Sequence, residues 1–163
     1  MIKKLTFLAL AGMNMAVYAQ QTKSVSVDEA RQLMATFYDA LNEPAKKNIE
    51  QLVTQSTTAD WQSCGGNDRE CVGREVVVNG FKKRGQVVPD LKWGISDVSL
   101  AGNVVTVRGE ATGTPVAEFL GVPAKGKSFR FMYISVHQLR DGKIARSYHV
   151  EDYAAAVRQL NAN

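Results

Sequence analysis

The sequence predicts an α+β fold in which helices come first and pack against one face of a curved antiparallel sheet. Two observations support this prediction. Residues 27–42 carry apolar side chains at three- and four-residue spacing, which is typical of an amphipathic helix. After Pro89 the chain changes to strand-like segments grouped around two glycine-containing turns, as in β-hairpins. A length of 163 residues suits one domain with a single core.

The helical half of the domain is expected to begin at Val27. Ser26 is a suitable N-cap, and Glu29 follows it at the spacing of a capping box. The first helix should end near Asn42, and Pro44 can occupy the first turn of the next one. The remaining elements expected in this half are a second helix over 44–55, a short strand or loop over 58–64 and a third helix over 73–85.

The other half of the domain is expected to consist of two hairpins, over residues 91–112 and 128–152. Gly102-Asn103 and Asp141-Gly142 provide their two-residue turns. The segment between the hairpins is rich in Gly and Pro, so it could border a pocket or be an excursion at the sheet edge. A helical pattern over 152–160 closes the chain.

Residues 1–19 are typical of a secretory signal peptide rather than of the folded domain. Two lysines precede an apolar run from Leu5 to Val17, and small residues suit a cleavage site after Ala19. The run is shorter than the roughly 20 residues that cross a bilayer, so an uncleaved anchor is the less favoured alternative. We therefore expect residues 20–163 to form a single domain that is periplasmic or secreted, without a membrane anchor.

The charge of the protein argues against a nucleic-acid partner. The net charge is +4, and it falls to +2 when the signal peptide with its two lysines is removed. The remaining Lys and Arg residues are scattered, whereas nucleic-acid binding needs a concentrated basic face. A short basic run at 81–85 suits the C-terminal end of a helix, where positive charge offsets the helix dipole.

Cys64 and Cys71 flank a short polar loop that contains two glycines. Export would place the cysteines where disulfides persist, so we expect them to be bonded to each other. A metal site would need further ligands nearby, and a redox pair would favour the C-x-x-C spacing. We therefore expect no metal in this protein.

The Asp141-Gly142 turn predicts which side chains share a face of the sheet. A two-residue turn pairs Arg140 with Lys143, and pairing continues outward from there. One face would then carry Phe129, Phe131, Tyr133, Ser135, His137, Arg146, Tyr148, Val150 and Asp152. The other face would carry Met132, Ile134, Val136, Ala145, Ser147, His149 and Glu151. The two histidines would lie on opposite faces, which disfavours a metal site that uses both.

The first of these faces has the composition of a pocket for a small hydrophobic molecule, with aromatic walls and few polar groups. The expected ligand-binding residues are Phe129, Phe131, Tyr148 and Trp93. Asp152, opposite Phe131 in this register, is a candidate general base. Asp152 could instead cap the closing helix or pair with Arg146.

Glu110 is a second candidate carboxylate. In the register set by Gly102-Asn103 it faces Ile95 and has no evident partner, although it could also face water. The same register pairs Arg108 with Asp97, which predicts a cross-strand ion pair.

Two further groups of side chains have alternative interpretations. Tyr133 and His137 are candidate hydrogen-bond donors, and both could instead serve only in packing. His149 and Glu151 could form a catalytic pair or simply mark a solvated strand end.

Three segments in order resemble the SnoaL-like polyketide cyclase or ester cyclase family: GNVVTVRGEATGT, FLGVPAKGKSF and HQLRDGKIARSYHVEDYAAAVRQL. The resemblance implies the cone of nuclear-transport-factor-2-like proteins, in which helices pack on a strongly bent sheet that encloses a pocket. It also implies frequent dimers through the outer sheet face and acid–base chemistry without a cofactor. The family's proton-abstracting aspartate corresponds to Asp152, or to His149 if that acid directly follows the aromatic residue. Tyr148 stands where the family usually has Trp.

These observations lead to two main functional hypotheses. The first is an exported domain that binds a small hydrophobic molecule in an apolar pocket. The alternative is a cofactor-independent cyclase, isomerase or lyase that abstracts a proton next to a carbonyl. In that enzyme Asp152 or Glu110 would be the base, and Tyr133 or His137 would donate to the enolate oxygen. A third hypothesis, a structural dimerisation domain, predicts that side chains fill the pocket.

Overall fold

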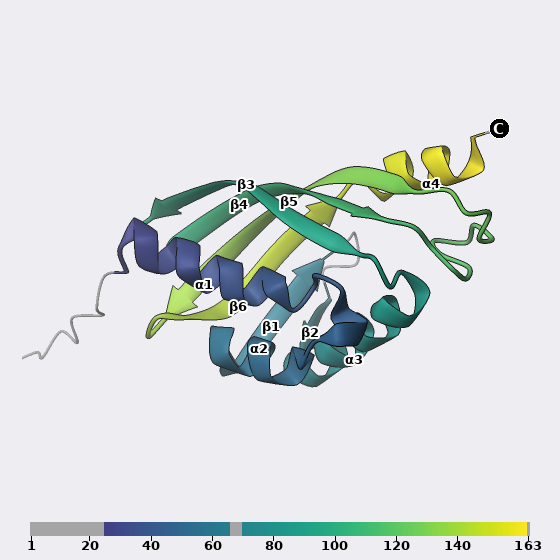
Figure 1. The fold of residues 1–163 in the computed structure, drawn as a ribbon. Coiled ribbons are helices and arrows are strands. Elements are labelled where there is room, and N and C mark those ends of the chain that lie inside the picture. Colours follow the sequence, from purple (N-terminus) through teal and green to yellow (C-terminus); the bar gives the residue numbers. More distant parts are fainter. Residues whose placement is uncertain (1–24, 66–69, 163) are drawn as a thin grey trace, which may run out of the picture.

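The structure is a computed structural model that describes residues 25–65 and 70–162, so the expected signal peptide lies outside the described residues (Figure 1). The helices are α1 (Val27–Asp39), the 3-10 helix η1 (Pro44–Lys46), α2 (Ile49–Ser56), α3 (Arg74–Val87) and α4 (Tyr153–Asn161). The strands are β1 (Thr57–Gly65), β2 (Cys71–Gly73), β3 (Lys92–Ala101), β4 (Val104–Gly113), β5 (Phe129–Arg140) and β6 (Lys143–Glu151).

One curved sheet with the strand order β2-β1-β6-β5-β4-β3 forms the frame of the molecule. The helices α1, α2 and α3 lie on one side of it, and α4 lies at one end (Figure 1). This arrangement confirms the predicted α+β cone. The sheet is mixed rather than antiparallel throughout, because β1 runs parallel to β6. This pairing joins the two halves of the chain and brings β1 beside the last strand.

The predicted start of the first helix is confirmed in detail. The Ser26 hydroxyl accepts a hydrogen bond from the Glu29 backbone at 3.2 Å, and the Glu29 carboxylate accepts one from the Ser26 backbone at 2.8 Å. The second expected helix is divided. Pro44 opens only the short η1, and α2 begins after Asn48, whose side chain accepts from the Gln51 backbone.

The β5–β6 hairpin closes at the predicted turn but shifts register beyond it. Asp141 and Gly142 adopt the left-handed conformation (φ 53° and 72°) that a two-residue hairpin turn requires. Pairing then slips by one between Leu139 and Gln138, because β6 contains Ala145 as an extra residue. Such a bulge turns the later side chains of the strand to the other face. The predicted faces are therefore correct for β5 and wrong for β6, whose inward side chains include Ser147, His149 and Glu151.

The β3–β4 hairpin contains a similar irregularity. Asp97 pairs with Arg108, and the two side chains form the predicted ion pair. Ser96 is then an extra residue on β3, so Glu110 lies opposite Gly94 rather than opposite Ile95 as predicted.

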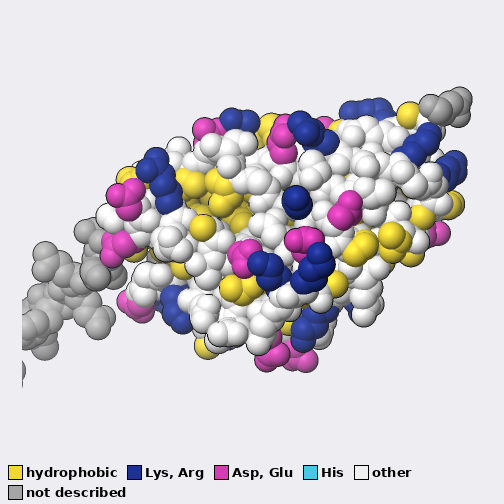
Figure 2. Space-filling view, in the orientation of Figure 1, with side chains coloured by type: hydrophobic (Ala, Val, Ile, Leu, Met, Phe, Trp, Pro, Cys, Tyr) yellow, Lys and Arg dark blue, Asp and Glu magenta, His cyan; other side chains and the backbone are white. Residues whose placement is uncertain are grey.

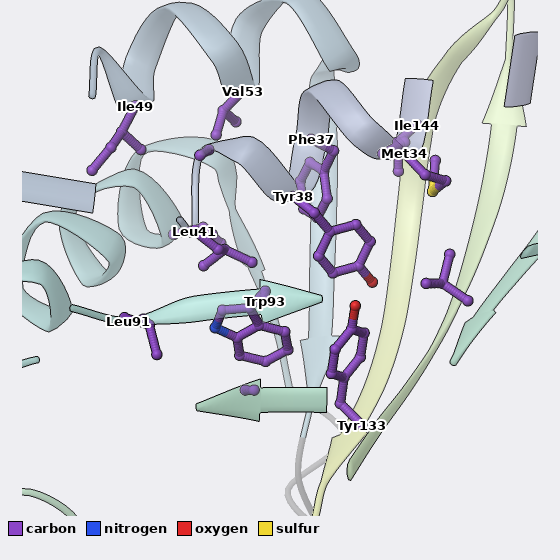
Figure 3. Close-up of a cluster of buried hydrophobic side chains, with 14 of the residues drawn as sticks. Met34, Phe37, Tyr38, Leu41, Ile49, Val53, Leu91, Trp93, Tyr133 and Ile144 are labelled. Carbon is purple, nitrogen blue, oxygen red and sulfur yellow. The ribbon is translucent and has the colours of Figure 1, made fainter. Parts of the chain in front are cut away.

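The core lies between α1 and the inner face of the sheet. Met34, Phe37 and Tyr38 of α1 are buried against the sheet residues Trp93 and Tyr133 (Figure 3). The hydroxyl groups of Tyr38 and Tyr133 point toward each other in this view. Each fully buried apolar side chain of this kind contributes roughly 1.5–3 kcal/mol to folding.

The surface of the described residues matches the scattered charge seen in the sequence. On the face drawn in Figure 2, Lys and Arg side chains are interspersed with Asp and Glu. Among the helices of residues 25–65 and 70–162, none has the length and apolar character needed to span a bilayer.

Candidate active site

A pocket of about 640 Å³ lies between the helical layer and the inner face of the sheet. Apolar side chains of α1 and α3, together with Trp93, form part of its wall. The strands β1, β5 and β6 supply polar side chains, which are Ser63, Ser135, His137, Ser147, His149 and Glu151. A cavity of this size with a few converging polar groups is typical of a small-molecule site.

His149 and Glu151 form a hydrogen-bonded pair on the pocket wall. They are two residues apart on β6 and therefore project to the same face. The imidazole Nδ1 lies 2.7 Å from the Glu151 carboxylate. The His149 side chain is 30% exposed, whereas the Glu151 side chain is only 8% exposed. The imidazole is therefore the more accessible group of the pair, and the Glu151 carboxylate lies behind the ring.

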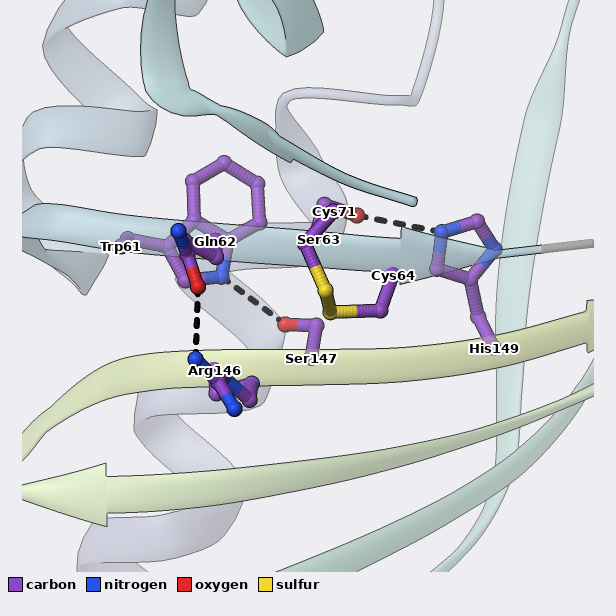
Figure 4. The surroundings of a disulfide bond; sticks show 8 residues. All are labelled: Trp61, Gln62, Ser63, Cys64, Cys71, Arg146, Ser147 and His149. Atoms are coloured by element: carbon purple, nitrogen blue, oxygen red, sulfur yellow. Dashed lines mark hydrogen bonds between the residues drawn. A yellow bond between two sulfur atoms is a disulfide. The ribbon is translucent and has the colours of Figure 1, made fainter. Parts of the chain in front are cut away.

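Ser63 contacts the other side of the His149 ring. Its hydroxyl lies 3.1 Å from the imidazole Nε2, and a dashed line marks this hydrogen bond in Figure 4. The parallel register pairs Ser63 with Ser147 and Gly65 with His149, so the hydrogen bond runs diagonally between the strands. Gly65 makes room for the ring, because a Cβ there would lie 2.2 Å from the imidazole Cε1.

A second, fully buried network forms the inner end of the pocket. His137 Nδ1 lies 2.8 Å from the Ser147 hydroxyl, and His137 Nε2 lies 3.2 Å from the Tyr38 hydroxyl. The Trp61 indole donates to the same Ser147 oxygen at 3.0 Å. Burial, with a further contribution from His149, lowers the pKa of His137 to about 3. His137 is thus a neutral imidazole with both nitrogens hydrogen bonded at physiological pH.

The candidate donor Tyr133 lies in the core next to this network. Its hydroxyl donates to the Gly94 carbonyl at 3.2 Å. Burial raises the pKa of Tyr133, and the neighbouring Tyr38 adds to the rise. Both phenols are therefore protonated at neutral pH, since burial also raises the pKa of Tyr38.

The two carboxylates singled out as candidate bases lie away from the pocket wall. Asp152 is exposed and accepts a hydrogen bond from the Ala155 backbone at 2.9 Å, so it caps α4. Glu110 is exposed and forms an ion pair with Arg130 at 3.4 Å. The structure thus brings His149 and Glu151 to the pocket in place of these two groups.

The expected ligand-binding aromatics are divided between core, surface and pocket. Phe129 and Phe131 are buried and stack on each other with ring centroids 5.4 Å apart. Tyr148 is 41% exposed on the outer face because of the bulge at Ala145. Trp93 lines the pocket, and its indole Nε1 is a buried donor without a hydrogen-bond partner among the described residues.

The predicted disulfide is present between Cys64 and Cys71 (Figure 4). It links β1 to the short strand β2 at the end of β1 that carries the site. Cys64 lies between Ser63 and Gly65, and both of these residues contact His149. The bond therefore fixes the backbone that positions the imidazole.

Among the described residues that line the pocket, Arg84 is the one Lys or Arg. It comes from α3 and lies beside Tyr153, where it opposes the effect of burial, which raises the pKa of Tyr153. Within the described part of the chain, no group of three or more His, Cys, Asp or Glu residues is placed to hold a metal ion.

A family model for SnoaL-like polyketide cyclases matches residues 16–160 of the chain. The chain belongs to the SnoaL-like polyketide cyclase family. Three solved structures share the fold of this SnoaL-like protein at low sequence identity. TsrD from Streptomyces laurentii has a TM-score of 0.73 and 24% identity, and the match covers 85% of this chain and 99% of that one.

The second structure is IdmH from Streptomyces antibioticus, with a TM-score of 0.71, 22% identity and coverage of 81% and 98% of the two chains. The third is a SnoaL-like polyketide cyclase from Agrobacterium tumefaciens, with a TM-score of 0.65, 21% identity and coverage of 80% and 97%. No curated protein matches the sequence. These similarities establish the fold of the SnoaL-like protein, and a shared fold does not determine the chemistry of the pocket.

Reasoning from the sequence missed two parts of the site in this SnoaL-like protein. Ser63 lies in a segment interpreted as a short strand or loop, and only its alternation with Trp61 and Gly65 indicates an inward face. Arg84 was assigned to a solvated helix end. Its place in the pocket follows from the packing of α3, for which the sequence carries no local signal.

Proposed function

We propose that this SnoaL-like protein is a cofactor-independent acid–base enzyme that removes a proton next to the carbonyl group of a small, mostly apolar molecule. One observation carries the proposal: the His149–Glu151 pair, with its imidazole toward the pocket and its carboxylate behind. In this arrangement the carboxylate orients the imidazole and stabilises the imidazolium that forms when the base takes a proton.

The proposed reaction begins when His149 Nε2 takes the proton from the carbon next to the carbonyl. In the resting structure Ser63 hydrogen bonds to this nitrogen, and the substrate replaces that contact. The resulting enolate carries negative charge on oxygen. Arg84 is the charged donor of the pocket, and it stabilises this oxygen. The enolate can then attack a second carbonyl, as in ring closure, or regain a proton at another atom, as in isomerisation.

Three other features of the pocket support a mostly apolar substrate. Phe37, Leu41, Val77 and Phe81 line the pocket, so binding removes apolar surface from water. The indole N–H of Trp93 has no partner among the described residues, which favours a ligand acceptor, because a buried donor without a partner costs roughly 1–3 kcal/mol. Tyr38 and His137 are held in place by their own hydrogen bonds.

The test uses simple aromatic ketones such as 2-tetralone. Binding is measured first, by quenching of tryptophan fluorescence, because Trp93 lines the pocket. Proton removal is then followed by NMR as exchange of the α-protons for deuterium in D2O. We expect the protein to accelerate exchange and His149→Gln to reduce the acceleration about 100-fold or more, since positioned acid–base groups contribute 10²–10⁴-fold.

Asp152→Asn is the matched control. Asparagine preserves the cap of α4, and Asp152 lies outside the pocket, so this variant should exchange at the wild-type rate. A ketone that binds without faster exchange would indicate a binding protein instead. If no ketone of the panel binds, or if Asp152→Asn loses the activity, the proposal is wrong.

We also propose that the protein acts outside the cytoplasm, as the signal-like residues 1–19 predict. The disulfide supports this location, because such bonds persist in oxidising compartments. Expression of the full chain in a bacterium with an outer membrane tests it. Recovery of a periplasmic form that begins at Gln20 is expected, and full-length protein retained in the cytoplasm would contradict export.

A further inference from the structure

We propose that Ser63 is a nucleophile activated by the His149–Glu151 pair, so that the same pocket hydrolyses esters of small apolar acids through an acyl-enzyme. This inference rests on the proposed function in one respect, because it uses the same imidazole as the base. It goes beyond that function in naming a covalent step, a nucleophile and a second class of substrate.

The hydrogen-bond geometry determines which ring nitrogen is the base. An ionised carboxylate only accepts hydrogen bonds, so the Glu151 contact at 2.7 Å places the hydrogen of the neutral ring on Nδ1. Nε2 then carries the lone pair. The Ser63 hydroxyl, 3.1 Å from Nε2, donates to it. Hydroxyl, imidazole and carboxylate are thus connected in the order that activates a serine nucleophile.

The backbone holds this arrangement in place without long flexible side chains. Ser63 and His149 lie on adjacent parallel strands, and Gly65 allows the ring to lie flat against β1. The Cys64–Cys71 bond anchors the same end of β1. A serine on a paired strand next to a disulfide has little freedom to turn away from its base.

The comparison with Ser147 shows why only one of the two serine–histidine contacts is assigned this role. The Ser147 oxygen already accepts from the Trp61 indole at 3.0 Å, and its partner His137 has no carboxylate. Tyr38 occupies the other nitrogen of His137. The Ser147–His137 contact therefore belongs to a closed structural network, whereas Ser63–His149–Glu151 borders the pocket.

The covalent reaction balances with water as the only co-reactant. Ser63 Oγ attacks the ester carbonyl carbon, and its proton passes to His149 Nε2. The bond to the alkoxy group breaks, and the departing oxygen takes that proton, which leaves an acylated Ser63 and a free alcohol. Water then attacks the acyl group with His149 as base, and the Ser63–acyl bond breaks with return of the proton to Oγ. Among the described lining residues, Arg84 is the cation available to the oxyanion in both halves.

The test treats the full-length protein with an alkyl fluorophosphonate and locates the adduct by peptide mass spectrometry. We expect one adduct, on Ser63 and not on Ser147, with labelling slowed about 100-fold or more by His149→Gln. Hydrolysis of p-nitrophenyl butyrate should fall by more than about 100-fold in Ser63→Ala, because residues of such a unit depend on each other. Asp152→Asn, outside the pocket, should match the wild type in both assays.

The two proposals fail in different ways. Ketone α-proton exchange should persist in Ser63→Ala, since that reaction uses the imidazole as base and does not use the serine. If Ser63→Ala keeps its ester hydrolysis while His149→Gln loses it, His149 acts alone and the nucleophile assignment is overturned. An adduct on another residue, or none on folded wild-type protein, also overturns it. Should Ser63→Ala fail to fold, the position of the adduct on the wild type decides.

Discussion

His137 and His149 project to the same side of the sheet, because Ala145 is an extra residue on β6. The two imidazoles nevertheless have different surroundings. His137 is enclosed by Tyr38, Ser147 and the core, whereas His149 reaches the pocket with a carboxylate behind it. This difference assigns His137 to the buried core and makes His149 the imidazole of the proposed reaction.

The tautomer of His149 can be measured directly. We expect 15N NMR of the neutral ring to show the hydrogen on Nδ1, as the Glu151 contact requires. In Glu151→Gln the amide can donate to Nδ1, so the hydrogen should move to Nε2 and the base should lose its lone pair. Ketone exchange should then fall as far as it does in His149→Gln. A hydrogen on Nε2 in the wild type would exclude the proposed base.

The buried His137 should make the protein less stable in mild acid. Its pKa of about 3 in the folded state lies below the ordinary value of 6.5, so the fold favours the neutral ring. The stabilisation is complete above pH 6.5 and is lost as the pH falls toward 3, because the unfolded state then binds the extra proton. The loss can reach roughly 1.4 kcal/mol per pH unit.

Urea unfolding of the wild type and His137→Gln at several pH values between 7 and 4.5 checks this expectation. Carboxylates titrate in both proteins, so the difference between them isolates the imidazole. The variant should be less stable at pH 7 and should depend less on pH. Equal pH slopes would show that His137 is protonated without penalty.

Gly65→Ala should damage the site more than a typical surface change. The added Cβ would lie 2.2 Å from the His149 ring, so the ring or the strand must move. We expect destabilisation of about 1–3 kcal/mol and loss of both proposed activities. Gly73→Ala is the control, since nothing lies within 4 Å of its Cβ and Gly73 is exposed and outside the pocket wall. Unchanged activity in Gly65→Ala would contradict the prediction that catalysis depends on the position of the His149 ring.

Removal of the disulfide should lower stability and loosen the site. A bond that closes a loop between residues seven apart in sequence contributes about 2.5 kcal/mol on the loop-entropy account. The Cys64→Ser/Cys71→Ser variant should therefore unfold at lower urea concentration, and reductant should change the wild type but not the variant. Equal midpoints for the oxidised and reduced wild type would contradict this role.

We also propose that two copies of the chain associate through the outer face of β5 and β6. Met132, Ile134 and Tyr148 are 48%, 38% and 41% exposed there, and apolar side chains gathered on one exposed face are typical of interaction sites. Light scattering should give twice the chain mass for the wild type and one chain mass for Ile134→Glu. Gln55→Glu, exposed on α2 away from this face, is the control. A monomeric wild type would contradict the proposal.

Local signals predicted most of the fold. The capping box of Ser26 and Glu29 and the left-handed turn at Asp141-Gly142 are encoded within a few residues, so these features were predicted correctly. The parallel pairing of β1 with β6 was not predicted, because it joins segments more than 80 residues apart. The bulge at Ala145 was also missed. Alanine at this position gives no local signal for a bulge. Because of the bulge, His149 lies on the inner face, where Tyr148 was predicted.

The site could be predicted only in part for the same reason. His137 and Trp93 were expected near the pocket and lie there, whereas Asp152 and Glu110 were chosen as bases from a register that each hairpin abandons. Asp152 caps a helix and its neighbour Glu151 faces the pocket. Both are acidic, so the sequence alone does not show which of them has which position. The bulge at Ala145 decides which of the two carboxylates reaches the cavity.

The contact between β1 and β6 has a consequence for how the protein is made. Ser63 is synthesised long before His149. The hydrogen bond between them can therefore form only when the chain is nearly complete. Fragments that stop before Glu151 should be inert however well their helices form. The proposed reactive centre is therefore complete only once β6, the last strand, has been synthesised.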